Sequence, residues 1–161
     1  MPTSPTGNRT RGVTLMEMMV VLAIIALIVG ISFPSTIAGL ENIRLGSGAR
    51  SVAAFMSSAA NRAERRQQAI ELTVFVKQNT LLLRSADGVF SRKLELPRNV
   101  VVSAVWPPLP EASDSPRQFL FLPGGAPPRM AIELANSRGL RRLVRLNPIT
   151  GVTEITQPES P

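Results

Sequence analysis

The sequence predicts an α+β fold, in which a long N-terminal helix precedes an antiparallel β-sheet domain. Residues 13–69 hold an unbroken apolar run and then apolar side chains that recur every three or four residues, and both patterns are typical of helices. Residues 70–161 hold short β-branched and aromatic runs separated by turns rich in Gly, Pro and Asn. We therefore divide the chain into four parts: residues 1–12, 13–33, 34–69 and 70–161.

Residues 13–33 form the apolar run, and Glu17 is the only charged residue in it. As a helix this run would span roughly 31 Å, which is enough to cross the hydrocarbon core of a bilayer. A carboxylate deep in lipid costs about 2.5–3.5 kcal/mol on insertion scales, so Glu17 needs a cationic partner. An ordinary single-span anchor is the alternative interpretation, but such an anchor needs no acid at this depth.

Residues 1–12 carry Arg9 and Arg11 and no acid, which predicts that the N-terminus lies in the cytoplasm and the rest of the chain across the membrane. The apolar run is longer than the core of a secretory signal peptide. No cleavage site with small residues follows it in a polar stretch. We therefore expect the apolar helix to stay on the mature protein.

Residues 34–69 are predicted to form an amphipathic helix. Pro34 lacks a backbone donor and is expected to bend the joined helix, and Gly46 and Gly48 weaken the helix near its start. The apolar stripe, which we interpret as domain core, consists of Leu45, Ala49, Val52, Met56, Ala59 and Ala63.

The remainder is predicted to form short strands joined by turns. Pro123-Gly124-Gly125 is interpreted as a rigid turn, and residues 107–116, with four prolines, as an exposed loop that is a candidate partner contact. The predicted strands are residues 70–77, 80–84, 89–96, 100–106, 118–122, 130–135, 140–146 and 152–155.

The stretch Gly12-Val13-Thr14-Leu15-Met16-Glu17 and the apolar run after it resemble the N-terminal segment of type IV pilins and type II secretion pseudopilins. Pro34 fits the same pattern, whereas Val13 stands where that family most often has Phe. The resemblance implies that residues 1–12 are a leader peptide, that a prepilin peptidase cuts after Gly12, and that the new N-terminal amine of Val13 is methylated.

The same resemblance assigns Glu17 a role in filament assembly. Its carboxylate would meet the N-terminal amine of a neighbouring subunit, so that one hydrogen-bonded ion pair replaces two unpaired buried charges. The resemblance also implies that the second half of the helix packs on the sheet, in a pilin-like architecture.

The C-terminal part resembles the GspH/FimT group of minor pseudopilins and minor pilins, through the segments Phe119–Gly125, Met130–Leu134 and Leu140–Val152. This implies a minor pseudopilin of a type II secretion system, a single-pass inner-membrane protein with most of its chain in the periplasm. Its partners would be the prepilin peptidase, the major pseudopilin and the minor subunits of the tip. The alternative is a FimT-like minor pilin of a type IV pilus that binds DNA.

Composition argues against an enzyme. The chain has no Cys and no His, so the usual zinc ligands and the His-dependent nucleophiles are missing. No acidic pair motif and no glycine-rich phosphate loop is present, so a membrane-anchored enzyme is disfavoured and no cofactor or metal is expected.

The net charge is +7, and loss of Arg9 and Arg11 with the leader would leave +5. Of the 18 basic residues only Lys77 and Lys93 are lysine. An arginine-rich surface could bind nucleic acid, but the basic residues are scattered, and a solvated basic surface is the favoured interpretation.

Overall fold

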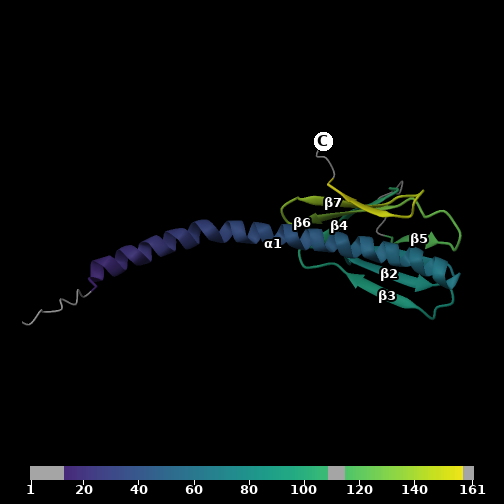
Figure 1. Ribbon diagram of the computed structural model, residues 1–161, viewed down its shortest axis with the longest axis horizontal. Coiled ribbons are helices and arrows are strands. Elements are labelled where there is room, and N and C mark those ends of the chain that lie inside the picture. The colour runs from purple at the N-terminus through teal and green to yellow at the C-terminus, as the bar shows by residue number, and fades with distance from the viewer. Residues whose placement is uncertain (1–12, 109–114, 158–161) are drawn as a thin grey trace, which may run out of the picture. The chain divides into compact units, whose positions relative to one another are not determined.

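The computed structural model describes residues 13–108 and 115–157, except that the side chains of residues 31–38 lie outside the description. The chain divides into two compact units, Met1–Ala38 and Gly39–Pro161. Helix α1 (Leu15–Arg66) runs through the end of the first unit into the second, where eight strands follow it (Figure 1). Each unit is described by itself below.

In the second unit the predicted apolar stripe of α1 is confirmed, because all six of its side chains are at most 1 % exposed. Ala53 and Phe55 are also buried and widen the stripe. Helix α1 ends at Arg66, where Gln67 takes a left-handed φ of 51°. The helix therefore stops three residues before the predicted end at residue 69.

All eight predicted strands are present, with bounds within two residues of the prediction. They are β1 (Ile70–Phe75), β2 (Thr80–Ser85), β3 (Ser91–Glu95), β4 (Val100–Trp106), β5 (Arg117–Phe121), β6 (Ala131–Asn136), β7 (Arg141–Leu146) and β8 (Thr153–Thr156). Several turns between them have a left-handed residue, such as Gly88 (φ 72°) between β2 and β3 and Asn79 (φ 49°) between β1 and β2.

The strands form two antiparallel sheets rather than one. The first sheet has the order β3-β2-β1-β5, and the second has the order β4-β6-β7-β8. The chain therefore leaves the first sheet to form β4, returns for β5, and then completes the second sheet. The predicted class, a helix packed on antiparallel β-structure, is confirmed, and the division into two sheets is a detail that the prediction did not contain.

Helix α1 and both sheets enclose one hydrophobic core. Side chains of one face of β1, such as Ile70, Leu72 and Val74, are fully buried in it, as are Ile132 and Leu134 of β6. Since every described core residue lies between Leu45 and Leu146, the unit Gly39–Pro161 contains a complete core of its own. Figure 1 shows the second half of α1 running alongside both sheets.

Candidate functional site

The start of α1 is fixed by a capping contact. The Thr14 hydroxyl Oγ1 accepts a hydrogen bond from the Glu17 backbone N–H at 3.2 Å, and the Thr14 carbonyl accepts one from Met18 N–H at 3.2 Å. Thr14 and Glu17 have the spacing of a capping box, and the helix dipole favours a carboxylate in the first turn. Thr14 is absent from the predicted site residues, although a Thr-x-x-Glu pattern before an apolar run is a signal for this role.

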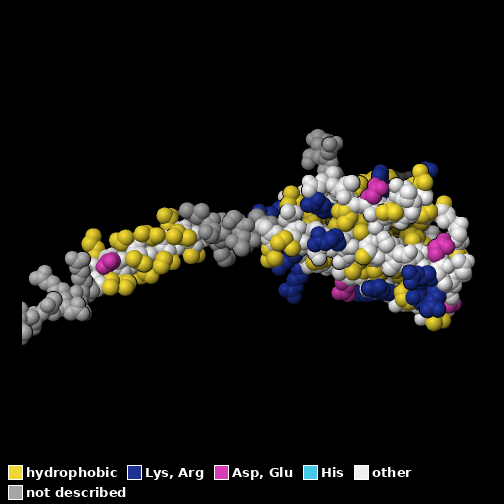
Figure 2. Space-filling model, viewed as in Figure 1, with side chains coloured by type: hydrophobic (Ala, Val, Ile, Leu, Met, Phe, Trp, Pro, Cys, Tyr) yellow, Lys and Arg dark blue, Asp and Glu magenta, His cyan; other side chains and the backbone are white. Residues whose placement is uncertain are grey.

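The apolar part of α1 is exposed in the part of the first unit that the structure describes. Every described side chain from Val13 to Gly30 is exposed, with Leu15 81 % and Met16 76 % accessible. Figure 2 shows hydrophobic side chains along this part of the helix with a single acidic side chain among them, and Glu17 is the only acid in these residues. An exposed apolar surface of this length indicates a binding surface for lipid or for other helices.

Among the residues whose side chains are described, no helical stretch is long and apolar enough to cross a membrane. The predicted span of residues 13–33 continues into residues 31–33, whose side chains lie outside the description.

The other predicted site residues are only partly described. Gly12 lies outside the described residues, and Val13 lies immediately before α1 with 60 % of its surface exposed. The backbone at Pro34 is helical, but its side chain is outside the description, so the bend at Pro34 stays a prediction. Of the predicted set, Val13 and Glu17 therefore lie together at the start of the helix.

In the second unit, polar side chains of α1 hold strands and turns of the β4-β6-β7-β8 sheet. Glu41 accepts from Ser137 Oγ at 2.9 Å and forms an ion pair with Arg138 Nε at 3.1 Å, which fastens the turn between β6 and β7. Ser57 Oγ and Thr153 Oγ1 lie 3.0 Å apart and connect β8 to the helix. These residues were not among the predicted sites, because a surface acid or serine on a helix has no sequence signal for a partner 96 residues away.

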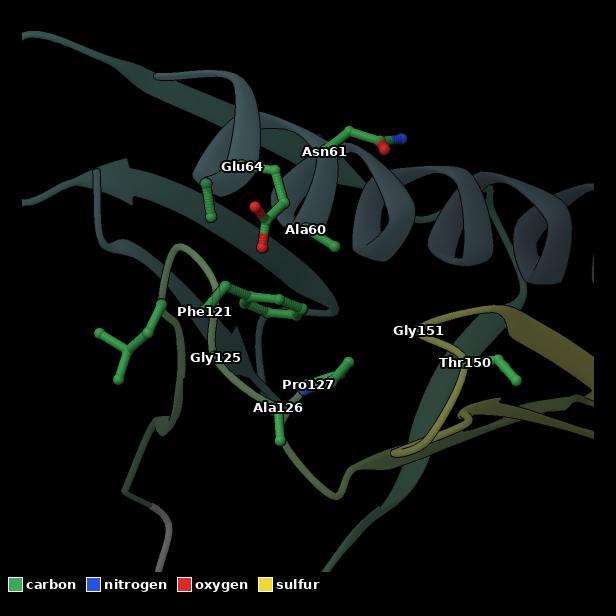
Figure 3. Close-up of a pocket in the computed structure, with 11 residues that line it drawn as sticks. Ala60, Asn61, Glu64, Phe121, Gly125, Ala126, Pro127, Thr150 and Gly151 are labelled. Carbon is green, nitrogen blue, oxygen red and sulfur yellow. The ribbon is translucent and has the colours of Figure 1, made fainter. Parts of the chain in front are cut away.

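Near the C-terminal end of α1, Glu64 borders a notch of about 230 Å³. The Glu64 carboxylate accepts a hydrogen bond from the Gly124 backbone N–H at 2.9 Å, and it points toward the turn that carries Phe121 and Gly125, whereas Asn61 points away (Figure 3). Glu64 is the only titratable group among the lining residues, so the notch lacks the paired groups that acid–base chemistry needs. In the described part of the chain, no cluster of three or more acidic, Cys or His residues could hold a metal ion.

The chain has two pairs of adjacent arginines, Arg65-Arg66 and Arg141-Arg142, and they lie at opposite ends of the second half of α1. Arg65 and Arg66 are in its last turn, whereas Arg141 begins β7 next to the turn held by Glu41. Residues 41 and 65 are separated by roughly 36 Å along a helix. Figure 2 accordingly shows Lys and Arg side chains in separate groups on the visible face rather than in one continuous patch.

Comparison with known proteins agrees with this arrangement. Residues 7–33 match the family model described as the prokaryotic N-terminal methylation motif. The fold is similar to that of the minor pseudopilin EpsH from the type 2 secretion system of Vibrio cholerae, with a TM-score of 0.56 and 13 % sequence identity. The similarity covers 73 % of this chain and 99 % of EpsH. No curated protein matches the sequence significantly.

Residues 7–33 thus carry an N-terminal methylation motif, and the fold of the chain is pilin-like. Among pilin-like proteins, the chain is structurally similar to the minor pseudopilin EpsH, and the predicted pilin-like fold class is confirmed. Pilin-like proteins are generally structural subunits rather than enzymes, and the motif implies processing by a prepilin peptidase.

Proposed function

We propose that this chain is a minor pseudopilin of a type II secretion pseudopilus, which supports the export of folded proteins across the outer membrane. The observation that carries the proposal is the uncovered apolar stretch from Val13 to Gly30, interrupted by Glu17 alone. A helix that exposes this much apolar surface must be buried in lipid or against neighbouring helices. In a filament, the helices of neighbouring subunits would bury it after the subunit leaves the membrane. The fold, which is similar to that of a minor pseudopilin over 73 % of the chain, supports the same role.

In this proposal the chain performs no chemistry of its own. Cleavage after Gly12 and methylation of Val13 leave a positively charged amine one helical turn from Glu17. The apolar helix, continued through Pro34, holds the subunit in the inner membrane with the second unit in the periplasm. In the filament, Glu17 pairs with the amine of a neighbouring major or minor pseudopilin, because a lone carboxylate in an apolar bundle is costly.

The processing site is tested by Gly12→Val. The larger side chain should block the peptidase, so that co-expression with the matching prepilin peptidase leaves the full-length precursor, as measured by intact mass. Thr10→Val is the matched control and should be shortened by 12 residues and gain one methyl group. Normal shortening of Gly12→Val would rule out this site.

The role of Glu17 is tested by comparing Glu17→Ala with Glu17→Gln. Both variants should insert and be cleaved, but enter pseudopili poorly, because either change leaves the neighbour's amine without a carboxylate. Because the chain has no Cys, single introduced cysteines can measure incorporation by crosslinking without background from the subunit itself.

Glu17→Gln separates charge pairing from helix capping, since Gln can also complete a capping box with Thr14. Incorporation of Glu17→Gln at the wild-type level would assign Glu17 to capping and exclude the charge pair.

A further inference from the structure

The β4-β6-β7-β8 sheet has an outer face that α1 does not cover. Strand pairing aligns Trp106, Ala131 and Arg145 in one row across β4, β6 and β7. The adjacent row is buried in the core and consists of Val105, Ile132 and Val144. Because side chains alternate along a strand, the row that contains Trp106 points away from the core.

An apolar groove of about 630 Å³ lies at one end of this outer face. Its wall at the end of β4 is formed by Trp106, Pro107 and Pro108, and its opposite wall by Pro148 and Ile149. Trp106 is 38 % exposed and Ile149 is 91 % exposed, so two large apolar side chains are presented to solvent. The volume is within the range of ligand-binding sites, and concentrated apolar exposure of this kind indicates a partner.

Both walls of the groove are held in place by polar contacts. Arg117 of β5 donates from Nη1 to the Val105 carbonyl at 3.4 Å and from Nη2 to the Pro107 carbonyl. On the other side, Asn147 Oδ1 accepts from the Ile149 backbone N–H at 2.9 Å. The groove is therefore formed before any partner arrives, which lowers the entropic cost of binding.

The charges of the groove are basic. Arg129 and Arg145 are the only ionisable residues among its lining, and Arg129 has no ion-pair partner in the described part of the chain. Arg145 is bound through one nitrogen to Glu154 at 3.0 Å, and its guanidinium keeps further donors. A carboxylate on an incoming ligand could therefore accept hydrogen bonds from the guanidinium groups of Arg129 and Arg145.

We propose that this groove binds an extended segment of another protein that carries apolar side chains and a carboxylate. Pro107, Pro108 and Pro148 have no backbone N–H, so recognition by side-chain packing against Trp106 fits the groove better than pairing with an added strand. The proposal goes beyond filament assembly, because it concerns the outer face of the second unit and does not depend on the apolar helix.

Two other occupants fit the charges less well. A second copy that presented the same face would bring Arg129 and Arg145 against their own counterparts. A nucleic acid strand places a negative charge at every nucleotide, but Glu154 lies beside Arg145, and Trp106 is the only aromatic ring for stacking. A peptide with apolar side chains and a carboxylate needs neither a continuous row of basic residues nor several aromatic side chains for stacking.

The single tryptophan of the chain lines the groove, so its fluorescence reports occupancy without a label. The full chain in nonionic detergent is titrated with acetyl-Leu-Pro-Glu-Leu-Pro-Glu-amide, with its Gln and Lys counterparts and with a short oligothymidylate. We expect a blue shift of the Trp106 emission with the acidic peptide and about fivefold tighter binding than for the Gln peptide, as for a few exposed charge pairs. Arg129→Gln should remove most of this preference, and Ile149→Ser should weaken both peptides.

Arg84→Gln is the matched control, since Arg84 is an exposed arginine of β2 in the other sheet, and it should bind like the wild type.

Equal affinity for the acidic, neutral and basic peptides, or an unchanged preference in Arg129→Gln, would refute the proposal. Stronger binding of oligothymidylate than of the acidic peptide would assign the groove to nucleic acid instead. A blue shift that grows with protein concentration alone would assign it to a second copy. Detergent partitioning of a given peptide is the same for every variant, so it cancels when the peptide preference of a variant is compared with that of the wild type.

Discussion

Asp87 joins the end of α1 to the turn between β2 and β3. Its carboxylate accepts hydrogen bonds from the Ser85 hydroxyl, from the Val89 backbone N–H at 3.0 Å and from Gln68 Nε2 at 2.7 Å. These donors, with Ser85 the largest contributor, lower the pKa of Asp87 from its ordinary value of 3.8. A carboxyl whose pKa is lower in the folded chain stabilises the fold in its ionised form.

Asp87→Asn should therefore change how stability depends on pH. Because the pKa of Asp87 is lowered by folding, its contribution is complete above the unfolded pKa and is lost as the pH falls through the folded pKa. The difference in melting temperature between wild type and Asp87→Asn, measured from about pH 6 to about pH 2, should be largest at the upper end and shrink below about pH 4.

Ser85→Ala gives an independent check, because it removes the main donor. The pKa of the Asp87 carboxyl, followed by NMR titration, should move back toward its ordinary value in that variant. A difference in melting temperature that stays constant across the pH range would contradict this role for Asp87.

Among the elements, α1 carries two glycines whose surroundings differ. A Cβ added at Gly46 would meet only the end of the flexible Arg50 side chain, at 3.5 Å. A Cβ at Gly48 would lie 3.4 Å from both Pro97 and Val100, where the loop before β4 crosses the helix. Gly46 therefore only weakens the helix, whereas Gly48 gives room for a packed loop.

Gly46→Ala should stabilise the unit Gly39–Pro161 by about 0.5–1 kcal/mol, because alanine loses less backbone entropy in a helix. The measurement is urea unfolding of a fragment of residues 39–161, which holds the whole described core. Gly48→Leu is the contrasting variant and should destabilise the same fragment by about 1–3 kcal/mol through overpacking against Pro97. Equal effects of the two substitutions would contradict the different environments of the two glycines.

The elements themselves could be predicted from the sequence because their signals are local. The stripe from Leu45 to Ala63 has helical spacing, and β4 was predicted with its observed bounds because Pro97-Arg98-Asn99 and Pro107 delimit it. The assignment of β4 and β5 to different sheets could not be predicted, since strand pairing depends on contacts between residues far apart in the chain. For the same reason, the contacts of Glu41, Ser57 and Glu64 could not be predicted, since their partners are distant in sequence.

At the scale of the whole molecule, the two candidate sites lie in different units of the chain. The first unit carries Val13 and Glu17, the part of the site that a short and specific sequence motif predicts. The second unit carries the groove beside Trp106, which the sequence did not predict because Trp106 and Ile149 come to line one groove only after β4 and β7 have both paired with β6. A candidate site with a local motif could be predicted from the sequence, whereas a candidate site assembled by strand pairing could not.

The distribution of arginine bears on the alternative function, DNA binding. A DNA-binding surface needs several cations close enough to follow one phosphate backbone. Arg65 and Arg66 lie in the last turn of α1, whereas Arg141 follows the turn held by Glu41 and is already paired with Glu133 at 3.0 Å. The fold thus keeps the two arginine pairs apart rather than joining them.

The unit of residues 39–161 should accordingly bind duplex DNA weakly at near-physiological salt. With one arginine pair per contact, the logarithm of the binding constant should fall with the logarithm of salt concentration with a slope of about −2, because each neutralised phosphate contributes about −0.9. A fluorescence titration at several salt concentrations measures both quantities. Replacement of Arg65, Arg66, Arg141 and Arg142 by Gln should then weaken this already weak binding further and flatten its salt dependence. Micromolar or tighter binding that this fourfold replacement abolishes would instead favour a DNA-binding minor pilin over a secretion subunit. Such binding would require both arginine pairs to contact the phosphate backbone of one DNA duplex.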